Sequence, residues 1–417
     1  MKKNIWIFHP YATPTELIGL TRPYEFAKEL KKYGYNVTIF SSSYLHYTSE
    51  NLINTKEKFL SKQYEGIDFV FIKTRTYKNN GIERILNFFD YYINLNKYIK
   101  KIEEYEKPDI IYASSPHPLS LLIGIKVSKK FKVKCIGEVR DFWPEVFFLG
   151  EKLKEKSIFG KILLRGERYL YKNVDALIFL KEGDINYIKE HKWDLIQGGD
   201  IDLNKVFYIN NGVDLKEFDK NIEIFKYEDK DLENKKFKIV YIGAIRRVNN
   251  LQRIVDVANK LKQDLDIEFL IFGDGSEKEK LELECKKKEI NNVKFKGYVS
   301  KKYIPYILSK SNLNILNYSQ NEYNWSRGNS SNKLFEYMAS GIPILSTIKT
   351  GYSIIDKYKC GIELQNGTVE EFYKKILEIK NMEKEKYLQM SLNARKGAED
   401  FTFEKLCLKL VNIIENK

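Results

Sequence analysis

Two runs of alternating strand and helix patterns, separated by a polar stretch, constrain the fold of this chain most strongly. The first run opens with NIWIF (4–8), TRPYEFAKELKKYG (21–34) and NVTIFSS (36–42), which predict a strand, a helix and a second strand. The second run opens with the strand pattern KIVYIG (238–243). Because strands that alternate with helices form parallel sheets covered on both faces, the sequence predicts an α/β fold with two doubly wound domains.

The polar stretch sets the domain boundaries. Residues 211–236 are charged and show no clear periodicity, which is typical of a connection between domains. We therefore predict an N-terminal domain at 1–215, a linker at 216–236 and a C-terminal domain at 237–400, and we expect 401–417 to form a helix that crosses back to the N-terminal domain. Further strands are expected at 68–74, 109–115, 133–139, 175–180, 205–211, 267–273, 293–297, 313–318, 342–347 and 361–365.

Composition narrows the class of protein. Hydrophobic residues make up 43% of the 417 residues, which excludes disorder, and no apolar run approaches the roughly 20 residues that span a bilayer. Four scattered cysteines without metal-ligand spacing fit a reducing cytoplasm. The net charge of +14 favours an anionic partner, either an acidic lipid surface or a phosphorylated substrate. Nucleic acid is disfavoured, because the lysines are mixed with glutamates and no arginine-rich arm is present.

Two loops at strand ends of the first domain carry chemically active side chains. In open α/β sheets, ligands bind at the carboxyl ends of the strands. The loop EVRDFWPE (138–145) lies at the end of the strand at 133–139, and two of its carboxylates, Glu138 and Asp141, are candidates to act as a base or to orient a hydroxyl group. The simpler alternative is a surface ion pair near a turn. The candidate acceptor-binding residues of these loops are His117, Arg140 and Trp143, although His117 also fits an ordinary loop histidine.

The segment SSNKLFEYMASGIPIL (330–345) predicts a polar loop, a short helix and a buried strand. Ser330, Ser331 or Asn332 can cap the helix, whose N-terminus offers free N–H groups to a phosphate. Lys333 and Glu336 share the stripe opposite the apolar side, where Glu336 can accept hydrogen bonds from the two hydroxyls of a ribose. The alternative is a solvated Lys–Glu pair on an ordinary surface helix.

Residues 151–172, EKLKEKSIFGKILLRGERYLYK, predict a basic amphipathic helix. Such a helix can rest on an anionic membrane surface. The alternative is that its apolar stripe packs on the protein's own sheet. The loop FGDGSEKEK after the strand at 267–273 allows close backbone approach to a ligand, whereas three D-x-D triplets lie in polar linkers or helix ends and indicate no metal clamp.

Four segments together resemble the GT-B glycosyltransferases, specifically family 4. They are the first loop with Gly19, INNGVD (209–214), YIGAIRRVNN (241–250) with FGDGSEKEKLE (272–282), and the SSNKLFEYMASGIPIL segment. The resemblance covers almost the whole chain and implies two Rossmann-like domains that face a central cleft. The residues that it places at a nucleotide-sugar donor are Gly19, Arg246, Arg247, Gly273, Asp274, Gly275, Ser330, Ser331, Asn332, Lys333 and Glu336.

The sequence departs from the family pattern in three places. Only the second member of the usual E-x7-E pair is present, because Gly328 stands eight residues before Glu336. The usual Arg…Lys-Gly pattern is replaced by Arg246 and Arg247, so the phosphate-binding arginine stays open. Arg140 and Asp141 stand where many members carry histidine and aspartate.

The resemblance implies a retaining, metal-independent hexosyl- or N-acetylhexosaminyltransferase that needs no cofactor. We expect a nucleoside-diphosphate sugar as donor and a saccharide or lipid-linked saccharide as acceptor in surface polysaccharide synthesis. We place the enzyme in the cytoplasm, on the inner face of the plasma membrane. The alternatives are a nucleotide-sugar 2-epimerase of the same architecture and a non-catalytic binder of anionic surfaces.

Overall fold

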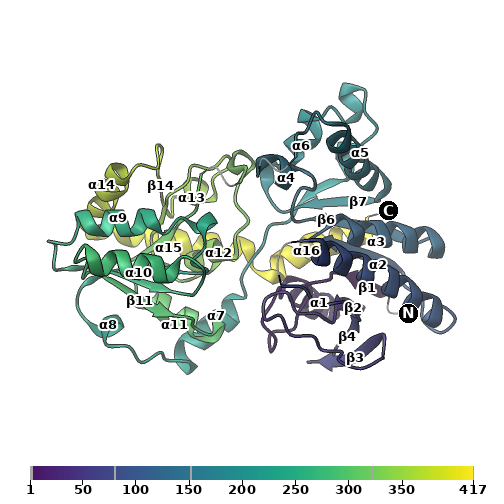
Figure 1. The fold of residues 1–417 in the computed structure, drawn as a ribbon, viewed down its shortest axis with the longest axis horizontal. Coiled ribbons are helices and arrows are strands. Elements are labelled where there is room, and N and C mark those ends of the chain that lie inside the picture. Colours follow the sequence, from purple (N-terminus) through teal and green to yellow (C-terminus); the bar gives the residue numbers. More distant parts are fainter. Residues whose placement is uncertain (1–2, 79–80, 151–152, 321–322, 417) are drawn as a thin grey trace. The chain divides into compact units, whose positions relative to one another are not determined.

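The chain forms two compact units, each built on its own sheet (Figure 1). The computed structural model describes residues 3–78, 81–150, 153–320 and 323–416. Unit 1 comprises Met1–Asn210 and Leu406–Lys417, and unit 2 comprises Asn211–Lys405. Helices cover both faces of each sheet, so the predicted α/β fold class is confirmed.

The sheet of unit 1 has eight strands in the described part of the chain. Their order is β3-β4-β2-β1-β5-β6-β7-β8, and only the β3–β4 pair is antiparallel among these neighbours. Long parallel crossovers of this kind require helices between the strands. The strands are β1 (Asn4–Phe8), β2 (Asn36–Ser42), β3 (Phe59–Tyr64), β4 (Ile67–Ile72), β5 (Ile110–Ser115), β6 (Lys134–Val139), β7 (Ala176–Phe179) and β8 (Val206–Tyr208).

Strand β3 was not predicted from the sequence. Its residues FLSKQY are all exposed or half-buried, because β3 forms the edge of the sheet and pairs with β4 on one side only. An edge strand lacks the buried apolar run that identifies the central strands.

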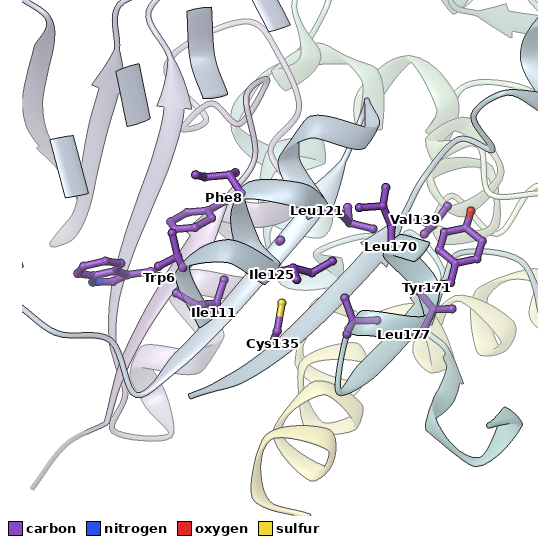
Figure 2. Packing of buried hydrophobic residues seen from close by; sticks show 14 of the residues in the cluster. Trp6, Phe8, Ile111, Leu121, Ile125, Cys135, Val139, Leu170, Tyr171 and Leu177 are labelled. Atoms are coloured by element: carbon purple, nitrogen blue, oxygen red, sulfur yellow. The ribbon is translucent and has the colours of Figure 1, made fainter. Parts of the chain in front are cut away.

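Two helical layers sandwich the sheet of unit 1. The layer that forms the main core contains α2 (Ile82–Ile102), α3 (Pro118–Phe131) and α5 (Ile158–Asn173). In Figure 2, Leu121 and Ile125 of α3 and Leu170 of α5 lie over the strands. On the opposite face, Tyr112 of β5 packs near Phe26 of α1 (Arg22–Lys32). The terminal helix α16 (Phe403–Glu415) reaches α1, where the Cys407 thiol contacts the Phe26 carbonyl.

The sheet of unit 2 has six strands in the described residues. Their order is β11-β10-β9-β12-β13-β14, and each neighbouring pair is parallel. One face packs against α11 (Ile304–Ser309), α12 (Asn332–Ala339) and α15 (Lys384–Ala398), and the other packs against α9 (Gln252–Lys260), α10 (Lys278–Lys287) and α14 (Val369–Lys380). The strands are β9 (Phe237–Ile242), β10 (Ile267–Phe272), β11 (Val293–Gly297), β12 (Leu313–Leu316), β13 (Ile344–Ser346) and β14 (Gly361–Glu363).

The segment expected as a linker has regular structure. Helix α7 (Leu215–Ile224) starts at Asp214, whose side chain accepts a hydrogen bond from the Glu217 amide, and α8 (Lys230–Glu233) follows. The helix signal was weak because Phe218 and Leu232 are the only buried residues in these two helices. Both helices belong to unit 2.

Candidate active site

Helix α12 forms the centre of the candidate site in unit 2. As predicted, Leu334, Phe335, Met338 and Ala339 are buried under the sheet. Tyr337, which the sequence did not single out, is also buried, and its hydroxyl accepts a hydrogen bond from the Ile242 amide at 3.0 Å. This bond ties α12 to the end of β9.

The predicted cap of α12 is not formed by a side chain. Ser331 occupies the N-cap position, but its hydroxyl makes no capping hydrogen bond. Its amide instead donates to the Asn329 side chain at 2.8 Å, and Asn211 donates to the Ser330 carbonyl at 2.5 Å. Hydrogen bonds from neighbouring segments therefore hold the Ser330–Asn332 turn in place, and the N-terminus of α12 that follows it has no side-chain cap.

The ammonium group of Lys333 lies close to two tyrosine rings. Its ammonium is 4.6 Å from the ring centre of Tyr241 and 4.3 Å from that of Tyr318, and it donates to the Tyr241 hydroxyl at 3.2 Å. Burial lowers the pKa of Lys333 to about 7, with partial opposition from the charge of Glu336. In the described residues no ion pair joins Lys333 to Glu336, so the solvated surface pair is wrong.

Glu336 lies half-buried one turn further along α12. Burial raises the pKa of Glu336, against the charges of Lys301 and Lys333. No hydrogen bond to its carboxylate is recorded within the described part of the chain. A half-buried carboxylate without hydrogen-bond donors is suited to accept them from a ligand.

The glycines at the ends of β9 and β10 bring two loops together beside Lys333. A Cβ on Gly273 would lie 1.9 Å from the Gly243 carbonyl oxygen, and one on Gly275 would lie 2.3 Å from the Ile245 carbonyl oxygen. Both glycines have positive φ, and the Ile245 amide donates to the Asp274 carbonyl at 2.9 Å. A Cβ on Gly243 would lie 3.1 Å from the Lys333 side chain. Only glycine fits these positions, which leaves backbone exposed beside Lys333.

The two candidate arginines follow β9. Arg246 precedes the short 3₁₀ helix Arg247–Asn249, and both arginine side chains are exposed. The buried side-chain amide of Asn317 holds their loop in place, because it donates hydrogen bonds to the Asn249 carbonyl at 2.5 Å and to the Asn250 carbonyl at 2.9 Å.

In unit 1, Glu138 is a fully paired core residue. It accepts hydrogen bonds from Arg22 at 2.7 and 3.0 Å, from Tyr112 at 2.6 Å and from Ser114 at 2.6 Å. Burial opposes its ionisation, but the charges of Arg22 and Arg140 lower the pKa of Glu138 to about 2. Arg22 also donates to the carbonyls of Ile209 and Asn210. Glu138 therefore has no free position for an acceptor, and its geometry is that of a structural ion pair.

Asp141 has the opposite environment. It keeps solvent contact, yet desolvation by the surrounding protein raises the pKa of Asp141 against the charges of Arg140, Lys181 and Arg84. Trp143 lies two residues on, and its indole N–H donates to the Pro116 carbonyl at 3.1 Å. Of the two carboxylates predicted after β6, Asp141 is the one available to a substrate.

His117 lies beneath this surface. It is fully buried, stacks on Phe88 at 4.0 Å between ring centres, and neither ring nitrogen has a hydrogen-bond partner in the described residues. Burial, with the charge of His9 and Arg84, lowers the pKa of His117 to about 3. His117 thus supports the site from within as a neutral ring. Gly19, the remaining predicted residue, packs against Thr13 in the loop after β1.

The D-x-D triplets are engaged in ion pairs or caps. Asp229 and Asp231 both pair with Lys296, and Asp264 pairs with Lys380 at 2.7 Å. Asp200 pairs with Arg168 at 2.8 Å and Lys172 at 3.1 Å. Among the described residues, no group of three or more His, Cys, Asp or Glu side chains is arranged to hold a metal ion.

Solved structures share this two-unit fold. HepE from Anabaena, in complex with UDP and glucose, has a TM-score of 0.65 and 13% identity over 100% of both chains. WaaG, a glycosyltransferase involved in lipopolysaccharide biosynthesis, has a TM-score of 0.67 and 13% identity over 99% of this chain and 100% of WaaG. The fold is therefore that of the GT-B glycosyltransferases.

Family comparisons identify both halves of the chain. Residues 21–217 match the family described as Glycosyltransferase Family 4, and residues 223–397 match Glycosyl transferases group 1. Both matched families are glycosyltransferases, so the chain is a glycosyltransferase. A 2-deoxystreptamine N-acetyl-D-glucosaminyltransferase from Niallia circulans is 27% identical over 115 residues, which are 27% of this chain and 28% of that relative's length.

Proposed function

We propose that this protein transfers a sugar from a nucleoside-diphosphate sugar to a hydroxyl group of a lipid-linked saccharide in surface polysaccharide synthesis. The observation that carries the donor half is Lys333, held close to two tyrosine rings over Gly243, with Glu336 one turn away and without a hydrogen bond in the described residues. The complexes of HepE with UDP and with UDP-glucose support a nucleotide-sugar donor, and the role of WaaG supports a polysaccharide product.

In this proposal the donor's diphosphate lies against Lys333 and the N-terminus of α12. Arg246 or Arg247 neutralises the charge that develops as the bond from the anomeric carbon to the phosphate oxygen breaks. Glu336 accepts hydrogen bonds from the ribose hydroxyls. The nucleoside diphosphate leaves with the bonding electrons, and the acceptor oxygen bonds to the anomeric carbon on the same face, so configuration is retained.

Asp141 orients the acceptor hydroxyl, whose proton passes to the departing phosphate oxygen. Its exposed position after β6 and the three cations around it support this role. A nucleotide-sugar 2-epimerase would instead act without an acceptor. Mass spectrometry of the purified protein with a panel of nucleotide-sugars tests the difference: we expect nucleoside diphosphate to form only with an acceptor, and a C2 epimer formed in its absence would overturn the proposal.

We also propose that transfer needs no metal ion. Cationic side chains are available at the donor site, and the carboxylates of the D-x-D triplets other than Asp266 contact lysines, arginines or the start of a helix. Activity should survive EDTA. Loss of activity that Mg²⁺ or Mn²⁺ restores would show that a metal takes part.

We further propose that the 151–172 segment holds the enzyme on an anionic membrane on the cytoplasmic side. Residues 151 and 152 lie outside the described residues, and no described helix is long and apolar enough to cross a membrane. The exposed side chains of Lys154, Lys156 and Lys161 support contact with acidic lipid. Flotation with phosphatidylglycerol vesicles should recover the protein at low salt, and no flotation there would refute this part.

A further inference from the structure

Unit 1 carries an apolar groove that includes Trp143 but none of the other residues assigned above to donor and acceptor chemistry. It has a volume of about 340 Å³ and lies between α3, the segment after β6 and α5. Its walls include Leu119 and Leu122 of α3, Trp143 and Phe147, and Leu163 and Leu170 of α5. This volume falls in the range of about 300–1,000 Å³ that is usual for small-molecule sites.

Among the described residues that line the groove, Glu167 is the one with a carboxyl group, and this group has hydrogen-bond partners within the protein. Glu167 is buried and accepts hydrogen bonds from Tyr171 and Tyr187, each at 2.6 Å. Burial raises the pKa of Glu167 to about 8, so the group is largely neutral at pH 7. The groove therefore offers hydrocarbon contact and no charged group to an occupant.

Helix α5, which forms one wall of the groove, also has an exposed surface that is both apolar and basic. Three apolar side chains of α5 are exposed: Ile158 at 82%, Phe159 at 60% and Ile162 at 53%. Exposed apolar side chains in such a group mark a contact surface. Lys161 and Arg165 lie beside them, and no ion pair of either is recorded in the described residues. The combination suits an amphiphile with a negative head group.

The inner end of the groove leads to Asp141. A small cavity lined by Asp141 and Ser115 shares Pro118, Trp143 and Leu170 with the groove. The cations around Asp141 are Arg140, Lys181 and Arg84. An occupant whose chain fills the groove thus has its head beside Asp141, within the influence of these three cations, although Arg140 also pairs with Glu138 at 3.7 Å and Lys181 with Asp184 at 3.3 Å.

We propose that this groove binds the hydrocarbon chain of the acceptor lipid, with the lipid's phosphate or diphosphate group at the cations around Asp141. The inference rests on the proposed function and adds the site that selects a lipid-linked acceptor. The apolar wall supplies affinity that grows with chain length, and the charge complementarity fixes which end of the lipid meets Asp141.

Gly166 allows the groove to be closed without disturbing the fold. It lines the groove on α5, and a Cβ added there meets no atom within 4 Å. Gly166→Trp places a large ring in the groove. Lys97→Trp puts the same ring at an exposed position of α2, outside the groove, as a matched control, and Gly166→Ala tests the backbone change alone.

The test measures binding of butyl, octyl and dodecyl phosphate, below their micelle concentrations, by calorimetry. Wild type, Lys97→Trp and Gly166→Ala should bind dodecyl phosphate about tenfold or more tightly than butyl phosphate. Gly166→Trp should lose this chain-length dependence while its thermal unfolding stays at the wild-type temperature. Affinity that does not depend on chain length, or a Gly166→Trp variant that retains the dependence, overturns the proposal.

Two further measurements separate the possible failures. UDP binding to the same preparations reports on the donor site, so a chain without a lipid groove is distinguished from one that is no nucleotide-sugar transferase. If alkyl phosphates do not bind but Gly166→Trp abolishes flotation with phosphatidylglycerol vesicles, the groove holds bilayer lipid and the acceptor assignment is wrong.

Discussion

Each unit has a carboxylate and a cation near the carboxyl ends of its strands, and the two pairs are built in opposite ways. In unit 1, Glu138 receives four hydrogen bonds at 2.6–3.0 Å from Arg22, Tyr112 and Ser114, and its pKa is lowered to about 2. In unit 2, burial lowers the pKa of Lys333 to about 7 and raises that of Glu336, and the two side chains do not pair. A buried charge with its partners built in stabilises the fold, whereas desolvated charges kept apart are poised for a ligand.

Removing the charge of Glu138 should have the largest effect. Glu138→Gln leaves Arg22 buried without its carboxylate, so unit 1 should lose about 3–5 kcal/mol of stability. Urea unfolding followed by a probe in unit 1 measures this loss, and UDP binding by the folded variant should not change. A variant as stable as wild type would show that the ion pair is dispensable.

The same pair predicts how unit 1 responds to acid. Because the folded-state pKa of Glu138 lies below its unfolded value, the ion pair's contribution is complete above about pH 5 and is lost as pH falls toward 2. The unfolding temperature of wild type should fall across this window. Glu138→Gln should show a shallower fall, since the residue no longer titrates.

Asp141 tests whether the available carboxylate after β6 is the one that acts on the acceptor. Asp141→Asn keeps the shape and removes the charge, so sugar transfer should fall by roughly 10²-fold or more. Donor binding by calorimetry should barely change, and Asp141→Glu should recover part of the rate because it restores the charge. Transfer by Asp141→Asn at the wild-type rate would remove Asp141 from the mechanism.

Glu336 tests whether the carboxylate that does not pair with Lys333 binds the ribose of the donor. Glu336→Ala removes a charged acceptor from the ribose hydroxyls and should weaken donor binding by about 1–3 kcal/mol, with the fold intact. A 2′,3′-dideoxy nucleotide provides the matched control, because it should bind wild type and variant alike. Equal affinity of the two proteins for the unmodified donor would leave Glu336 without a role in ribose recognition.

Local patterns predicted the elements well where burial is strong. Strands β1 and β2 have the predicted bounds, because each is a short apolar run that ends at a turn. The stripe that carries Lys333 and Glu336 also followed from helical spacing. Edge strand β3 and helix α8 were missed, since neither buries a continuous apolar face.

The partners of the charged residues were beyond a sequence-based prediction. Arg22 is 116 residues from Glu138, and Tyr241 is 92 residues from Lys333. Whether a carboxylate is paired or free depends on such tertiary contacts, so Glu138 and Asp141 were equivalent in the sequence and differ in the structure. Tyr318 provides the second ring beside Lys333. In the sequence it was recognisable only as the last residue of a predicted strand.

Lys333 provides the most specific test of the comparison, because its charge should depend on the ligand. With a pKa of about 7 in the free protein, Lys333 is largely neutral above that pH and charged below it. A bound diphosphate stabilises the charged form and raises this pKa, so donor binding takes up a proton in the window above pH 7. UDP affinity should therefore weaken as pH rises from 7 to 9, by at most about tenfold per pH unit.

Calorimetry in buffers of different ionisation enthalpy measures the proton uptake directly. Lys333→Arg should bind UDP without proton uptake, because a guanidinium stays charged across this range. Lys333→Met should bind more weakly at pH 6, where wild type is charged, and the two proteins should converge toward pH 9. If wild type takes up no proton and its UDP affinity is constant from pH 7 to 9, Lys333 is already charged in the free protein. The two sites would then differ only in the partners of their charged groups, and not in whether those groups are ionised.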